Sequence, residues 1–157
     1  MVQAELSNTW LLSGNIVNAR TAADGFLKSA LSTSDPHLQA LAWDLQARVA
    51  VAENDLQGAR ESIQQGLAIV DKFEILIAAW QVYGTAWRLH QRVKEHKTAE
   101  TNRQRAETCI LKIANSFAAD EPLRTTLLSA TPVRLILREK VVNKARRQQE
   151  LRRVATP

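Results

Sequence analysis

The feature that most constrains this chain is an internal register of forty residues. Gly14, Asn54 and Lys94 lie forty positions apart, and each stands in a short polar break between two stretches with helical periodicity. An alanine follows each break at the same offset of five positions, at Ala19, Ala59 and Ala99. A small residue there lets two helices approach closely, because protein interiors are packed to crystal-like density. Repeats of about 20–50 residues indicate stacked helical units that bury their apolar faces only against each other.

The register divides the chain into three predicted helical hairpins, over about residues 1–35, 36–72 and 74–117. A capping region is expected over 120–137 and a basic helical tail over 138–157. Asp35 can cap the second hairpin with Pro36 at its first position. With four Pro and five Gly in 157 residues, the chain predicts helix throughout. The first helix is shorter than its counterparts, so we expect the chain to be the end of a longer one, with an apolar edge that a second copy could cover in a homodimer.

The side-chain order around each break resembles the tetratricopeptide repeat: an aromatic residue (Trp43, Tyr83), a small residue, a Gly-Asp-like turn and an alanine. The forty-residue spacing resembles the long variant found near the C-terminus of large bacterial signalling ATPases, nucleotide-cyclase-linked regulators and transcriptional activators. The resemblance implies a right-handed α-α superhelix, or solenoid, of three hairpins with a C-terminal capping helix. It also implies a scaffold or regulatory segment that binds a partner protein or peptide. Arg103, where the family prefers an aromatic residue, and Trp87, at a usually small position, depart from the pattern.

The resemblance also implies a concave binding face, formed by the first helix of each hairpin. The positions that it assigns to this face are Asn8, Arg48, Arg88, Gln91 and Arg92. Aligned arginines can hold a carboxylate or an acidic peptide through paired, charge-assisted hydrogen bonds. A competing interpretation is that Asp44 and Arg48, four residues apart, neutralise each other on a solvated helix face. The stripe formed by Trp80, Tyr83 and Trp87 is interpreted as core and not as a ligand cage, because it follows the packing register.

The net charge of +5 belongs entirely to the tail, because residues 1–137 carry 14 positive and 14 negative side chains. The candidate anion-binding residues of the tail are Lys140, Lys144, Arg146, Arg147, Arg152 and Arg153. They make a nucleic-acid-binding accessory protein the alternative function, with salt-sensitive, non-specific affinity. The tail has no aromatic residue for base stacking, and its apolar face is too thin for a membrane surface.

No pattern of catalytic residues is present. His90 and His96 lie six apart without a Cys or carboxylate at metal-ligand spacing, and Cys109 lies in a helical run as a small packing residue. We therefore predict no enzyme activity, no metal and no cofactor. A single cysteine suits a reducing compartment, and no apolar run reaches the roughly 18 residues of a membrane helix. These features predict a cytoplasmic protein with no membrane partner.

Overall fold

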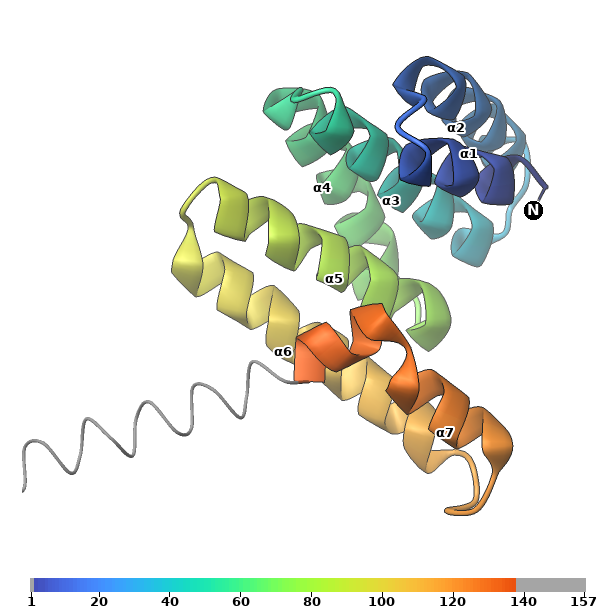
Figure 1. Ribbon diagram of the computed structural model, residues 1–157, viewed down its shortest axis with the longest axis vertical. Coiled ribbons are helices and arrows are strands. Elements are labelled where there is room, and N and C mark those ends of the chain that lie inside the picture. Colours follow the sequence, from blue (N-terminus) through green and yellow to red (C-terminus); the bar gives the residue numbers. More distant parts are fainter. Residues whose placement is uncertain (1, 138–157) are drawn as a thin grey trace, which may run out of the picture. The chain divides into compact units, whose positions relative to one another are not determined.

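The structure is a computed structural model that describes residues 2–137 (Figure 1). Within this range all regular secondary structure is helical, and no strand occurs. The helices are α1 (Val2–Leu12), α2 (Ile16–Leu31), α3 (Pro36–Ala52), α4 (Leu56–Lys72), α5 (Leu76–Arg92), α6 (His96–Asn115) and α7 (Pro122–Ser129). Residues 131–137 form a further helical segment. The predicted all-α class is therefore confirmed for the described residues.

The start of α3 follows the predicted cap at Asp35, and α4 begins with a cap of the same kind. The side chain of Asp35 accepts a hydrogen bond from the His37 amide (2.8 Å), and Pro36 occupies the first turn of α3. Asp55 caps α4 in the same way, because its side chain accepts a hydrogen bond from the Gly58 amide (2.9 Å). These bonds satisfy amides that have no partner inside the helix.

The end of α6 lies two residues before the predicted one at Phe117. The Ser116 amide donates to the Ile113 carbonyl (3.1 Å), and the Ser116 hydroxyl donates to the same oxygen (2.7 Å). This tightened last turn takes up the carbonyl that a further α-helical residue would need, so the helix stops at Asn115.

The forty-residue register is present in the backbone. Gly14, Asn54 and Lys94 adopt the left-handed conformation, with φ of 76°, 63° and 62°. In each turn the amide of the next residue donates to the carbonyl five positions earlier, from Asn15 to Trp10 (2.9 Å), Asp55 to Ala50 (2.9 Å) and Glu95 to His90 (2.8 Å). This is the Schellman arrangement, in which a left-handed residue ends one helix and the chain reverses. The same turn therefore occurs three times at the predicted spacing.

The described residues fall into two compact units, which divide between Cys109 and Ile110. In the first unit α1 contacts α2 and α3, α2 contacts α3, and both α3 and α4 contact α5. One core cluster joins α2 to α3 through Ala19, Ala23, Phe26, Ala30, Ala42, Leu45 and Val49. The alanines predicted at the close approach of each helix pair, Ala19, Ala59 and Ala99, are all buried.

The aromatic stripe of α5 belongs mainly to this core. Tyr83 and Trp87 are buried, and Trp80 is half-buried. The Tyr83 hydroxyl donates to Asp71 of α4 (2.7 Å). Burial and this carboxylate raise the pKa of Tyr83 well above its ordinary value. The prediction of a core stripe is confirmed for two of its three residues.

The second unit holds the end of α6, α7 and the segment 131–137. Among its described residues, the buried side chains are Ile110, Ala114, Val133 and Ile136. Arg124 of α7 donates from Nη1 to the Ala114 carbonyl (2.8 Å), which satisfies an oxygen near the C-terminal end of α6. The capping role expected for residues 120–137 stays a prediction. The predicted tail, 138–157, lies outside the described residues.

Candidate binding surface on the first helices

Two of the predicted binding residues, Arg48 of α3 and Arg88 of α5, lie in one charge cluster with Asp44. Asp44 is only 1% exposed, although it is an aspartate on α3. Its Oδ2 lies 2.9 Å from Nε of Arg48, whose side chain is 32% exposed. Arg48 Nε does not reach aligned hydrogen-bond geometry in this contact, so the pair is held mainly by charge. The predicted pairing of Asp44 with Arg48 is thus present, but it is not on a solvated face.

Arg88 brings a second guanidinium to this pair. The protein around it lowers the pKa of Arg88 by desolvation, the nearby Asp44 opposes this shift, and Arg48 adds to it. Arg88 is nevertheless exposed as a residue, so solvent reaches it and it remains a cation at neutral pH. Within residues 2–137 it makes no hydrogen bond or ion pair. The cluster of Asp44, Arg48 and Arg88 therefore carries one net positive charge, and its outermost cation is unpaired.

Two buried oxygens near this surface also have unused hydrogen-bonding capacity. Asp44 Oδ1 and Asn8 Oδ1 accept no hydrogen bond from the described residues. Buried polar atoms are nearly always paired, so an orphan acceptor marks a place where a donor would be stabilised. Asn8 is half-buried on α1, which contacts α3. The structure thus puts Arg48 and Arg88 together and leaves Asn8 on the neighbouring helix.

Arg92, also predicted to bind a partner, is engaged within the chain. Its Nη1 donates to the Val51 carbonyl (3.1 Å), and its Nη2 donates to Asn54 Oδ1 (2.7 Å). It therefore joins the end of α5 to the turn after α3, forty residues earlier in the sequence. Gln91 is exposed at the surface. Arg92 is better described as a structural tie than as a free binding group.

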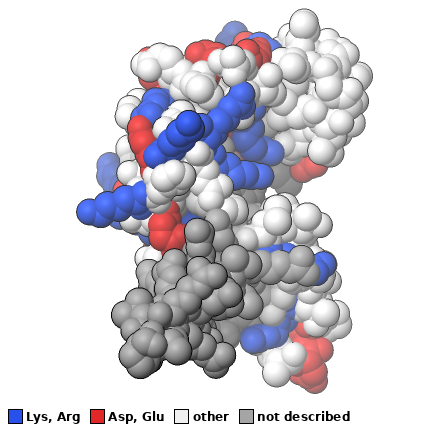
Figure 2. Space-filling model, turned by 60° about the vertical axis from the view of Figure 1, so that its left-hand side comes forward, with Lys and Arg blue, Asp and Glu red and all other residues white. Residues whose placement is uncertain are grey.

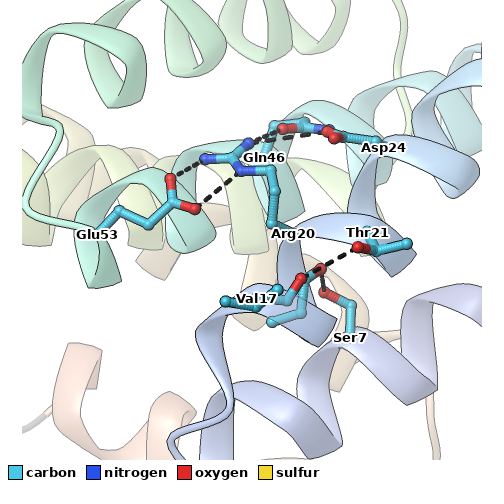
Figure 3. Close-up of polar contacts among 8 residues, drawn as sticks. Ser7, Val17, Arg20, Thr21, Asp24, Gln46 and Glu53 are labelled. Carbon is cyan, nitrogen blue, oxygen red and sulfur yellow. Dashed lines mark hydrogen bonds and ion pairs between the residues drawn. The ribbon is translucent and has the colours of Figure 1, made fainter.

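A polar tie that the sequence analysis missed connects α2 to α3. Arg20 donates from Nε to Glu53 (3.1 Å) and from its two terminal nitrogens to Glu53 and Gln46. Gln46 in turn donates to Asp24 (2.7 Å). Figure 3 shows the Arg20 guanidinium between Glu53 on one side and the Gln46–Asp24 pair on the other. The Glu53 hydrogen bond raises the pKa of Arg20 above its ordinary value.

A second tie stands forty residues later. Arg60 of α4 forms an ion pair and hydrogen bond with Glu95, which also contacts His90 Nδ1 (2.7 Å). Hydrogen bonds from Arg60 and then His90 lower the pKa of Glu95 below its ordinary value. The recurrence of arginine at positions 20 and 60 was the sequence signal for both ties. At the third position the chain has Glu100, which pairs with Arg103 on its own helix (2.9 Å).

The surface around these residues mixes both charges. Figure 2 shows Lys and Arg side chains at several places on the face drawn, with Asp and Glu side chains among them. Within residues 2–137, no three His, Cys, Asp or Glu side chains lie close enough together to hold a metal ion. No helix of that range has the length and apolar character to cross a bilayer. The tail candidates, from Lys140 to Arg153, lie outside the described residues.

Comparison with family models, with curated proteins and with solved structures finds no match for this chain.

Proposed function

We propose that this protein is a protein–protein interaction module, a right-handed solenoid of three tetratricopeptide-like hairpins of the kind found in scaffold or regulatory segments of signalling proteins. Its partner is a peptide segment that lies along the face formed by α1, α3 and α5. Arg48 and Arg88 are the residues that hold it. Helices fixed by mutual packing lose little conformational entropy on binding, which favours such a surface as a docking site.

The observation that carries this proposal is Arg88, an exposed residue with no hydrogen bond or ion pair among the described residues, beside the pair formed by the buried Asp44 and the half-buried Arg48. Arginine is enriched among the residues that dominate binding energy at protein interfaces. Its planar fork of donors suits carboxylates and peptide carbonyls. The contacts of α3 with both α1 and α5 put these side chains on adjacent helices, as an extended peptide would require.

Selection of peptides from a displayed random library on the full chain tests the proposal. We expect the enriched peptides to bind wild-type protein and to lose about tenfold or more in affinity on Arg88→Gln, the size of a charged hydrogen-bonding anchor. Arg134→Gln is the matched control, because Arg134 is an exposed arginine of the second unit. Peptides that bind Arg88→Gln as tightly as wild type would remove Arg88 from the binding surface and overturn the proposal.

A further inference from the structure

The turn between α1 and α2 carries the two most exposed large apolar side chains of the described residues. Leu12, just before Gly14 in the chain, is 90% exposed, and Val17, just after it, is 76% exposed. Both therefore lie at the same end of this helix pair, beside the left-handed turn at Gly14. Removal of such side chains from water is favourable, so an apolar surface packed on this end would be stabilised.

The forty-residue register shows that these two positions are exposed at every turn. Their equivalents at the second and third turns are small, polar or basic, and all are exposed: Ala52 and Arg92 for Leu12, Gln57 and Lys97 for Val17. Ala52 and Gln57 stay exposed although α3 contacts α2 and α5, and α4 contacts α3 and α5. A helix pair packed before α1 in the same way would therefore leave Leu12 and Val17 uncovered.

The segment that forms the first turn has no charged side chain. Residues 6–19 contain no Lys, Arg, Asp or Glu, although 24% of the chain is charged. The charges at its two ends are Glu5 and Arg20, and Arg20 is tied to Glu53 and Gln46. In a two-fold contact a patch meets the same patch of the other copy, so a patch of one sign would repel itself. A charge-free apolar turn meets no such repulsion and is suited to a second copy of itself.

We propose that two copies of this chain associate through the α1–α2 turn, with Leu12 and Val17 of each copy packed against the same residues of the other. A standard protein interface buries about 800 Å² on each partner, and two exposed side chains supply only part of that area. The dimer is therefore weak and depends on protein concentration. This inference does not rest on the proposed function, because it uses neither Arg48 nor Arg88.

Sedimentation velocity of the full chain, from micromolar to millimolar concentration, tests the proposal. Wild-type protein should pass from monomer to dimer as its concentration rises. Leu12→Arg and Val17→Lys introduce the residues that the third turn has at the same positions, where the backbone has the same conformation, so both variants should fold. Circular dichroism checks this. Each variant should weaken dimerisation by about tenfold or more, because like charges then meet across the contact.

A mixture of two variants identifies the second copy as the occupant of this surface. Val17→Lys and Val17→Glu should each be monomeric alone, and an equimolar mixture should dimerise again, since opposite charges then face each other. The matched control is Ile77→Lys on α5, because Ile77 is another apolar residue that is 58% exposed. It should keep the dimerisation of the wild type.

Three results would overturn the proposal. Wild-type protein that stays monomeric at every concentration has no such contact. A dimer that Leu12→Arg and Val17→Lys leave unchanged is formed by another surface, and a mixture as monomeric as its two components shows that the two Val17 side chains do not meet. Co-sedimentation of monomeric wild-type protein with uncharged phosphatidylcholine vesicles, lost in Val17→Lys, would assign the turn to a lipid surface instead.

Discussion

The first helix pair, α1 with α2, and the second, α3 with α4, share one turn geometry and differ in the side chains that they present. Both pairs reverse at a left-handed residue, Gly14 or Asn54. Both have a buried alanine five positions later. Yet Leu45 of α3 is 1% exposed, whereas Glu5, at the equivalent position of α1, is exposed.

This difference separates two kinds of position in the repeat. The left-handed conformation of the turn residue and the buried alanine after it recur at all three positions, because both depend on backbone geometry and close approach. The burial of a side chain on a helix face depends on the element packed against that face. At Leu45 of α3 this element is α2. The candidate binding residues belong to this second kind, because at one register position Asn8 and Arg48 are half-buried whereas Arg88 is exposed.

The largest expected difference between the two pairs is at positions 5 and 45. Leu45→Ala should lower the free energy of unfolding by about 2–5 kcal/mol, because it removes a fully buried side chain and leaves a cavity between α2 and α3. Glu5→Ala should change it by less than about 0.5 kcal/mol, as at an exposed site. Urea unfolding followed by circular dichroism measures both. Equal effects at the two positions would mean that α1 and α3 are packed alike.

Local signals in the sequence predicted the all-helical class and the positions of several helix ends. The start of α3 at Asp35-Pro36 and the breaks at Gly14, Asn54 and Lys94 depend on residues that are near each other in the chain. The ties were not predicted, since Arg20 meets Glu53 thirty-three residues away and Arg92 meets Val51 forty-one residues away.

The sequence predicted which residues form the candidate site but not how deeply they are buried. The register placed Arg48 and Arg88 on equivalent helices, and the i, i+4 spacing gave the Asp44–Arg48 pair. Burial of Asp44 could not be derived, because it depends on how α3 is covered by its neighbours and not on its own periodicity. Commitment of Arg92 to the turn after α3 was missed for the same reason.

Substitutions at the first and third left-handed turns, Gly14 and Lys94, should have an intermediate effect on the free energy of unfolding. Gly14→Ala should lower the free energy of unfolding by about 1–2 kcal/mol, because a residue with a Cβ is strained in the left-handed conformation. No heavy atom lies within 4 Å of the added Cβ, so crowding contributes nothing. Lys94→Gly removes the same backbone strain at the third turn and should raise the free energy of unfolding by up to about 1 kcal/mol. The greater conformational entropy of glycine in the unfolded chain reduces this gain. Thermal unfolding of both variants tests the sign; a neutral Gly14→Ala would contradict the backbone argument.

The smallest expected effect concerns the two arginine ties and their response to acid. Hydrogen bonds from Arg60 and His90 hold the pKa of Glu95 below its ordinary value, so the folded chain binds this proton less readily than the unfolded chain does. The stabilisation is therefore complete above the ordinary glutamate value of about 4.3 and is lost as the pH falls through the lowered pKa of the folded state. Glu95→Gln should flatten this part of the acid dependence of the unfolding free energy.

Glu61→Gln is the matched control for the acid experiment, because Glu61 of α4 accepts a hydrogen bond from Gln57 (2.7 Å) and has no ion pair among the described residues. It should keep the wild-type slope between pH 3 and about pH 5, the range in which glutamates titrate. Arg20→Ala should leave the contribution of Glu95 intact, because Arg20 is tied to Glu53 and Gln46 instead. A loss of the Glu95 contribution in that variant would show that the two ties act as one network and not as independent copies of one contact.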